Sequence, residues 1–230
     1  MNRRLLLDLD GRLGARDRVA LLVDAEPDGD DFDLALDASA AADGPIAALA
    51  GLDAPLDMRV RGDGTWTQWD GALLVRSEDE RVAALQLTNR AGRFGLLGTV
   101  DPTVFLTGLP AEALGDKVAL KGDIAIDNRV FDGTAIVAGR KVSLSAEGLV
   151  DLADNRADDL EMVVRVRDPA VLGDGIALRD TRLTATLDGS FDDLAIAHEA
   201  RVGELDIGGT VLTRLRQEGT ARYDLSLIHI

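Results

Sequence analysis

The stretch Leu56-Asp57-Met58-Arg59-Val60-Arg61 decides the fold that we expect for this chain. Apolar and charged residues alternate in it without exception, and successive side chains of a β-strand point to opposite faces of the sheet. The stretch therefore predicts a strand with one apolar and one charged face. Leu56, Met58 and Val60 would lie on the apolar face.

The same alternation recurs along the chain, at residues 32–38, 141–148, 160–167 and 183–188. Glycine is frequent, with 24 residues, and it supplies the positive φ that tight turns need. We expect an all-β protein of a dozen or more antiparallel strands. Asp-Gly pairs are favoured in short hairpin loops, and those that we expect to form such loops are Asp10-Gly11, Asp28-Gly29, Asp63-Gly64, Asp70-Gly71, Asp132-Gly133 and Asp188-Gly189.

Three segments break the alternation and predict short helices or irregular crossings. Pro45–Leu52 begins with proline, which is favoured in the first turn of a helix. Residues 102–114 predict a second helical or irregular crossing, which we expect Pro110 to interrupt. A third short helical turn is expected after Pro169.

Composition excludes several classes of function. Asp and Glu number 41 against 25 Lys and Arg, so the formal net charge is −16. Such a chain is a poor partner for nucleic acid or an anionic membrane surface, since both are bound by basic side chains. There is no cysteine, which excludes disulfides, thiolate metal sites and cysteine nucleophiles. An apolar share of 46% is too high for a disordered acidic chain.

The sequence carries no recognisable catalytic motif, and we predict that the chain is not an enzyme and binds no cofactor or metal. Its two histidines are His198 and His229, and we interpret His198 as an exposed strand or loop residue rather than a general base. The densest acidic cluster, Asp28–Asp33, fails the EF-hand frame because Asp33 stands where glycine is needed. We interpret it as a solvated acidic turn.

Trp66 and Trp69 are the only two tryptophans. A spacing of three places them on opposite faces of a regular strand, unless a bulge intervenes. We expect one ring packed at the end of the core and one half-exposed ring, rather than a platform for stacking a ligand.

Four stretches resemble the TamB family, which belongs to the wider AsmA-like group. They are residues 18–30 (RVALLVDAEPDGD), 64–75 (GTWTQWDGALLV), 87–92 (LTNRAG) and 217–224 (QEGTARYD). The resemblance covers nearly the whole chain. It consists of similar residue patterning and short similar segments rather than of a catalytic signature. TamB proteins are the inner-membrane-anchored component of the translocation and assembly module.

The resemblance implies an elongated, twisted antiparallel sheet that curls into an open apolar groove and spans the periplasm. It implies that the groove carries phospholipid acyl chains and that the parent protein works with an outer-membrane barrel partner in protein assembly and secretion. Set against that family, we expect this chain to lack the anchor helix and any signal or transmembrane segment, and to be too short for the region that meets the barrel. We therefore do not expect that partner to bind this fragment alone.

Residues 1–224 are accordingly expected to form one β-groove segment of a longer protein, with no firm internal boundary. Transfer of one CH₂ group out of water is worth about 0.8 kcal/mol, so a continuous aliphatic trough would hold a lipid tail along its length. The candidate lining residues, chosen by alternation, are Leu56, Met58, Val60, Val142, Leu144, Leu160, Met162, Val164, Val166, Leu183 and Leu187.

Alternation alone does not distinguish this open trough from a closed core. The alternative is a β-sandwich binding or adhesion module, in which two sheets pack their apolar faces together. A hydrolase on a β-scaffold is disfavoured, because the acidic residues are scattered along the polar strand faces.

The last six residues, 225–230 (LSLIHI), match one reading frame of a transposon-end adapter used in sequencing libraries. We interpret them as adapter translation, which places the end of the genuine sequence at Asp224. An ordinary terminal strand is the alternative.

Overall fold

The computed structural model describes residues 3–14, 16–27, 29–45, 47 and 54–224. This part of the chain contains fourteen strands that follow one another in the sheet in the same order as in the sequence. The prediction of an all-β, antiparallel protein is therefore confirmed. The tail 225–230 lies outside the described residues, as does most of the helix expected at Pro45–Leu52. The chain divides into two compact units, Met1–Leu106 and Thr107–Ile230.

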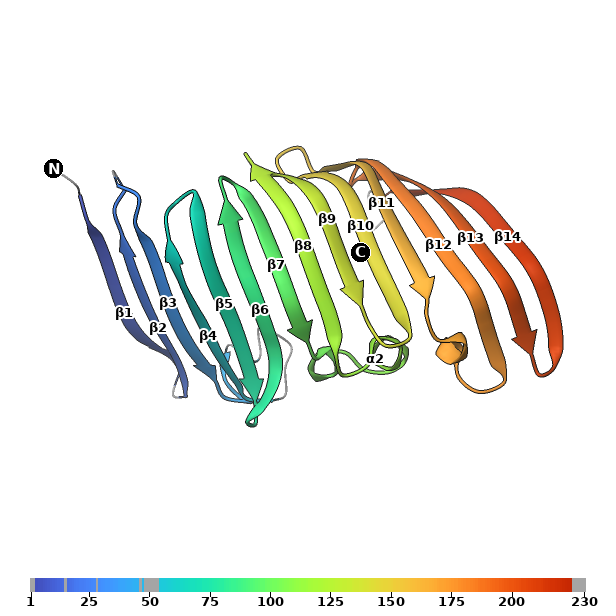
Figure 1. Ribbon diagram of the computed structural model, residues 1–230, viewed down its shortest axis with the longest axis horizontal. Coiled ribbons are helices and arrows are strands. Elements are labelled where there is room, and N and C mark those ends of the chain that lie inside the picture. Colours follow the sequence, from blue (N-terminus) through green and yellow to red (C-terminus); the bar gives the residue numbers. More distant parts are fainter. Residues whose placement is uncertain (1–2, 15, 28, 46, 48–53, 225–230) are drawn as a thin grey trace. The chain divides into compact units, whose positions relative to one another are not determined.

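Unit 1 is a run of antiparallel hairpins in which each strand pairs with the strands before and after it in sequence (Figure 1). Its strands are β1 (Leu5–Leu13), β2 (Asp17–Ala25), β3 (Phe32–Ala40), β4 (Leu56–Gly64), β5 (Gln68–Ser77), β6 (Glu80–Arg90) and β7 (Arg93–Val100). A 3₁₀ turn, η1 (Pro102–Val104), follows.

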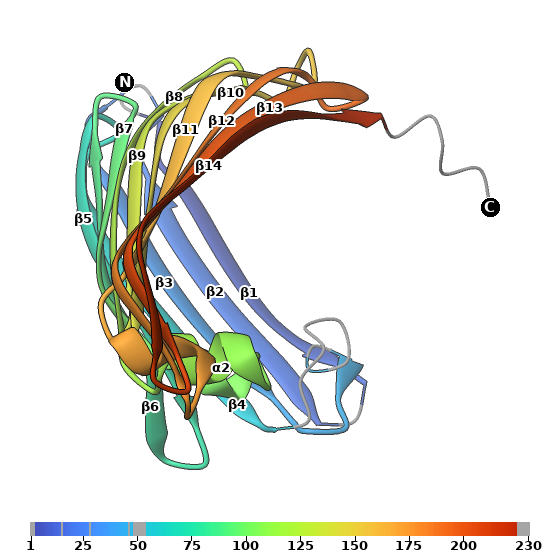
Figure 2. The same ribbon diagram turned by 90° about the vertical axis from the view of Figure 1, so that its right-hand side faces the viewer.

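Unit 2 repeats this plan with longer strands toward its C-terminal end. Its elements are α2 (Leu109–Leu114), β8 (Val118–Asp127), β9 (Val130–Ala138), β10 (Val142–Asp151), β11 (Arg156–Val166), η2 (Pro169–Leu172), β12 (Ile176–Ser190), β13 (Asp193–Ile207) and β14 (Thr210–Asp224). Strands β12, β13 and β14 arch along their length, which makes one face of this group concave (Figure 2).

Several hairpins close through two residues that both have positive φ, the arrangement that matches the twist of the flanking strands. These residue pairs are Glu78–Asp79, Ala91–Gly92, Asn128–Arg129 and Gly208–Gly209. The predicted Asp-Gly loops are mostly wrong. Four of the pairs lie inside strands, namely Asp10-Gly11, Asp70-Gly71, Asp132-Gly133 and Asp188-Gly189, whereas Asp63-Gly64 ends β4 just before its turn. Asp28 is outside the described residues.

Some of these in-strand glycines occur where another group approaches the backbone too closely for a side chain. At Gly133, a Cβ atom would stand 2.2 Å from the carbonyl oxygen of Asp123 on the neighbouring strand. Glycine within a strand commonly marks such an approach. Without knowledge of the pairing, the sequence signal for this approach resembles a turn signal.

The predicted crossing at 102–114 consists of η1 and α2, and Pro110 does not interrupt it. Pro110 lies in the first turn of α2, where a backbone N–H has no intrahelical partner to lose. The helical turn expected after Pro169 is confirmed as η2. Asp101 and Asp168 cap the two 3₁₀ turns, accepting hydrogen bonds from the backbone N–H groups of Thr103 and Ala170.

The described residues show no second sheet packed against the strands, so the closed β-sandwich is not observed in this part of the chain. Ten apolar residues are buried among them, and five of these ten are alanines. Most large aliphatic side chains therefore keep some contact with solvent.

Candidate functional site

One face of unit 1 is almost entirely apolar, and we call it the apolar face of unit 1. Strand pairing fixes its membership, because residues directly opposite each other point to the same face. A row across β3 to β6 joins Leu36, Val60, Leu73 and Leu85. The predicted lining residues Leu56, Met58 and Val60 all lie on this face, opposite Ala40, Ala38 and Leu36 of β3.

The apolar face of unit 2 is defined by the same rule, and it contains the other eight predicted lining residues. Leu144 on β10 lies opposite Val164 on β11, which in turn lies opposite Leu183 on β12. The remaining members pair as Val142 with Val166, Met162 with Ala146 and Ala185, and Leu160 with Leu187. The structure thus gathers three of the predicted residues on one face of unit 1 and eight on one face of unit 2. Whether they line a lipid path stays a prediction.

A β-bulge maintains this face along β11. The register between β11 and β12 shifts between Ala157 and Leu160, and Asp159 adopts a positive φ of 46°. An extra residue in one strand re-aims the side chains that follow it. As a result Ala157 and Leu160 both pair with residues of the apolar face, Gly189 and Leu187, although an odd spacing separates them.

Sequence reasoning missed much of the apolar face. In unit 1 the additional members include Leu9, Leu21, Leu73, Leu87 and Leu96, and in unit 2 they include Leu120, Ile124, Val137 and Ile196. The signal that would have found them is cross-strand pairing, because alternation within one strand does not reveal which face its neighbours share.

The apolar faces are open to solvent. Leu9 is 51% exposed and Leu183 is 43% exposed. Both lie on an apolar face, where a closed core would bury them. The aliphatic rows are therefore available to an apolar ligand.

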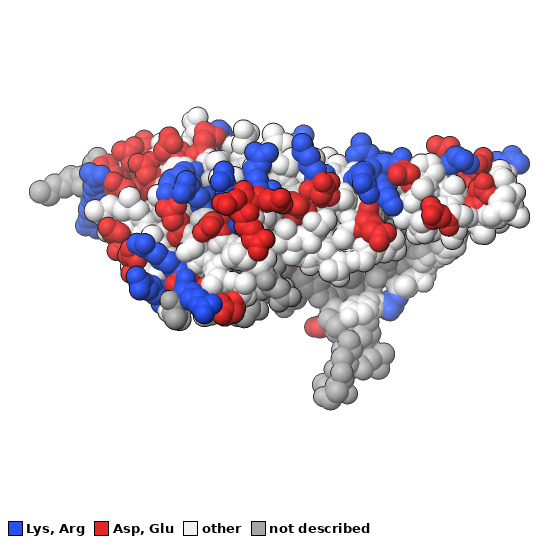
Figure 3. Space-filling model, turned by 90° about the horizontal axis from the view of Figure 1, so that it is seen from below, with Lys and Arg blue, Asp and Glu red and all other residues white. Residues whose placement is uncertain are grey.

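The opposite face of each unit is polar and carries ion pairs between neighbouring strands. Arg90 on β6 contacts Asp70 on β5 at 2.7 Å, and Arg222 on β14 contacts Asp193 on β13 at 2.5 Å. Figure 3 shows acidic and basic side chains interspersed rather than gathered in blocks of one sign. Exposed pairs of this kind add little stability, but they leave the polar face well hydrated.

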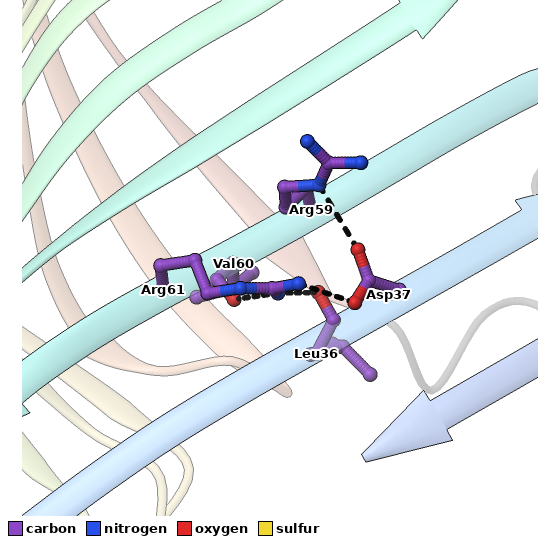
Figure 4. Close-up of polar contacts among 5 residues, drawn as sticks. All are labelled: Leu36, Asp37, Arg59, Val60 and Arg61. Carbon is purple, nitrogen blue, oxygen red and sulfur yellow. Dashed lines mark hydrogen bonds and ion pairs between the residues drawn. The ribbon is translucent and has the colours of Figure 1, made fainter. Parts of the chain in front are cut away.

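A hollow of about 760 Å³ lies on the polar face of unit 1, over strands β2 to β5. Arg59 and Arg61 converge there on Asp37: the Arg59 Nε lies 3.0 Å from Asp37 Oδ1, and Arg61 pairs with Oδ2 (Figure 4). Arg61 also donates to the backbone oxygens of Leu36 and Val60. Hydrogen bonds from Arg61 and Arg59 hold the pKa of Asp37 below its usual range.

Similar contacts lower the pKa of other carboxyl groups on the polar faces. Arg18 lowers the pKa of Asp10, Arg4 lowers that of Asp24, and hydrogen bonding by Arg201 is the main cause for Glu199. All of these carboxyl groups are kept ionised. This favours fixed ion pairs over general acid catalysis, which needs a raised carboxyl pKa.

An aromatic cluster marks one end of the apolar face of unit 1. The Phe32 ring centroid lies 4.5 Å from that of Trp66 and 6.3 Å from that of Trp69. The two tryptophans therefore contact the same ring and do not lie on the opposite faces that a regular strand would give them. Trp69 packs closely against Gly62 and Gly71 whereas Trp66 is half-exposed, which agrees with the expectation of one packed and one half-exposed ring. Trp66 lies in the turn between β4 and β5, where strand alternation does not apply, and its Nε1 donates to the Glu26 carbonyl oxygen at 3.1 Å. It is 45% exposed.

His198 is the remaining group of chemical interest. It lies on β13 within the apolar face of unit 2, half-buried rather than fully exposed as expected, and its Nε2 is 3.0 Å from the Gln217 Nε2. Among the described residues of β12, β13 and β14 that pair around it, no carboxylate lies on the same face as His198.

Within the described residues, no group of three or more His, Cys, Asp or Glu side chains could hold a metal ion. No helix in the same part of the chain is long and apolar enough to cross a membrane.

Comparisons of the chain with protein-family models, with curated proteins and with solved structures find no match.

Proposed function

We propose that this chain is a periplasmic β-groove segment of a TamB-like protein, and that it holds phospholipid acyl chains on its apolar faces as they pass between membranes. The observation that carries the proposal is the open aliphatic face of each unit, where large side chains such as Leu183 remain exposed. The sequence resemblance to TamB agrees with this interpretation. It extends the proposal to outer-membrane biogenesis and to support of protein assembly and secretion by the parent protein.

Lipid tails would bind because their apolar surface is removed from water along the aliphatic rows, without a single fixed pocket. Each CH₂ group of a lipid tail gains about 0.8 kcal/mol when it leaves water. Aliphatic rows such as Leu144, Val164 and Leu183 present a similar surface from strand to strand. A tail would therefore be held with similar affinity at successive positions, which favours movement along the rows over capture at one position.

The polar faces support the same role. Their ion pairs are exposed, and the chain carries a net charge of −16. A hydrated, negatively charged surface disfavours adsorption to anionic headgroups on that side. Lipid contact would then be confined to the apolar side.

The alternative, a binding or adhesion module with a closed apolar core, requires a second layer over the aliphatic rows. No second sheet occurs in the described residues. No observation favours this alternative.

Photo-crosslinking tests the proposal directly. A photoreactive amino acid is placed at Leu144 or Val164, and the chain is incubated with vesicles that contain radiolabelled phospholipid. The matched controls are Ser145 and Arg165, which lie on the same two strands but on the polar face. We expect phospholipid adducts at Leu144 and Val164 and few at the controls. Adducts that are absent at both apolar positions, or equally abundant at the controls, would overturn the proposal.

A further inference from the structure

Two polar residues interrupt the apolar face of unit 2 on its last two strands. His198 on β13 lies between Ala185 on β12 and Gly219 on β14, and Gln217 on β14 lies opposite Ala200 on β13. The next residues of this face on β13, on either side of His198, are Ile196 and Ala200. An imidazole and an amide therefore occur together within an otherwise aliphatic region. We call them the polar pair.

The hydrogen bond between His198 and Gln217 uses only some of the N–H donors of the polar pair. The two Nε2 atoms lie 3.0 Å apart, so one donates to the other. When the amide donates to a neutral imidazole, His198 keeps an Nδ1–H donor and Gln217 keeps a second N–H donor. The imidazole ring lies over Gly219, where an added Cβ would come within 3.0 Å of the His198 Cε1.

The charged side chains nearby are engaged on the other face. Glu199 contacts Arg201 at 2.8 Å and Arg216 at 2.5 Å, and Arg216 contacts Glu218 at 2.8 Å. The register places these groups on the polar face, because each is adjacent in sequence to a residue of the apolar face. In the described stretches 183–189, 194–202 and 215–223, no carboxylate shares the apolar face with the polar pair.

We propose that the polar pair is a binding position for the anionic head of a lipid whose tail lies on the adjoining aliphatic rows. This inference rests on the proposed function, which it deepens by giving the ligand an orientation. The N–H donors of His198 and Gln217 would bind a carboxylate or phosphate oxygen. The tail would extend over Leu187 and Leu183 toward β11. A hydrogen bond to a charged acceptor is expected to raise affinity about tenfold or more.

A purely structural role for the polar pair predicts a different outcome. Polar groups near the edge of a sheet discourage pairing with other chains. Such a role requires no discrimination between ligands that share a tail and differ in the head.

Fluorescence titration separates the two roles. The probes are cis-parinaric acid, which has a carboxylate, and its methyl ester, which has the same tail without the charge. The test variants are H198L/Q217L, which makes the pair apolar, and Q217E, which places a negative charge beside the head. The control is T184L/T186L, with the same number of polar residues replaced on the polar face of β12. Circular dichroism confirms that each variant is folded.

We expect the unmodified chain to bind the acid more tightly than the ester. H198L/Q217L should weaken acid binding about tenfold and change ester binding less than about twofold. Q217E should also weaken binding of the acid more than binding of the ester. This variant therefore tests the proposal even if H198L/Q217L does not fold. Displacement of the bound acid by lysophosphatidate would show that a phosphate head is accepted, and displacement by palmitate alone would restrict the position to carboxylates.

The possible failures are distinguishable. If the unmodified chain binds neither probe, the proposed function itself is wrong. If it binds both probes and every folded variant affects them equally, acyl binding stands and the head-binding role of the polar pair is overturned.

Discussion

The indole ring of Trp69 lies over the backbone of Gly62, so closely that a Cβ atom at Gly62 would stand 2.0 Å from the ring carbon Cζ2. The same ring covers Gly71, where a Cβ would come within 2.2 Å of Cη2. Gly62 and Gly71 lie opposite each other on β4 and β5. The two glycines together form the flat surface on which the tryptophan packs.

Replacement of either glycine by alanine should therefore destabilise unit 1. Gly62→Ala and Gly71→Ala should each lower the free energy of unfolding by about 1–3 kcal/mol, the usual cost of forcing extra atoms into a packed contact. Urea denaturation measures the effect. Gly11→Ala is the control, because a Cβ there meets only the Val19 oxygen at 4.0 Å. An equal loss in the control variant would show that strand glycines matter for reasons unrelated to Trp69.

Asp17 should contribute to stability through a buried hydrogen bond. It is 1% exposed, and its Oδ1 accepts the Ala41 N–H at 2.9 Å. Asp17→Ala should cost about 1–3 kcal/mol, because it removes the acceptor of this bond. Asp43→Ala, which breaks only the exposed pair with Arg16, should cost less than about 1 kcal/mol. Similar midpoints of urea unfolding for the two variants would contradict this account of Asp17.

The two faces of unit 2 should respond differently to an added charge. Leu183 is on the open apolar face, whereas Val163 is 4% exposed although it lies on the opposite face between Ser145 and Thr184. Val163→Glu should strongly lower the thermal midpoint, because it buries a charge. Leu183→Glu should lower it less while it weakens binding of cis-parinaric acid. A reversed order of thermal midpoints would mean that the apolar face is covered in solution.

Stability should fall in acid, with a sign fixed by the lowered pKa values. Asp10, Asp24, Asp37 and Glu199 have pKa values below their usual range in the folded chain. As the pH is lowered, these groups therefore take up protons in the unfolded state before they do so in the folded state. Their contribution to folding stability is complete above about pH 5 and is lost as the pH falls through their pKa values in the folded chain. Urea midpoints at pH 7, 4 and 2.5 should decrease in that order. In the double variant Arg59→Gln/Arg61→Gln, the urea midpoint should decrease less between pH 7 and pH 2.5 than it does in the unmodified chain. If the variant and the unmodified chain have the same pH profile, Asp37 does not contribute to the pH dependence of stability.

Local patterns in the sequence were sufficient to predict that the alternating segments are strands with one apolar side, but not the full membership of either apolar face. The alternation at Leu56–Arg61 predicted β4, and the predicted residues on β10, β11 and β12 lie on one face. The turns were harder to predict. Glu78 and Asp79 have positive φ without being glycine, so tight pairing of β5 with β6 imposes a conformation that the residue types do not favour.

Features that depend on contacts between distant residues could not be predicted from a single sequence. The shared contact of Trp66 and Trp69 with Phe32 depends on the pairing of β3 with β4. The polar pair depends on the register of β13 against β14, since nothing in the sequence near His198 indicates Gln217 as its neighbour.

Within the described residues of each unit, every strand pairs only with strands that are adjacent to it in sequence. This arrangement affects how the protein tolerates local damage and the insertion or loss of strands. The energy of such an array is close to a sum of nearest-neighbour terms, as in repeat proteins. Local damage to one hairpin should weaken the adjacent strands and leave distant ones protected from hydrogen exchange. Insertion or loss of a whole hairpin preserves strand direction on both sides, so a lineage could lengthen or shorten such an array two strands at a time.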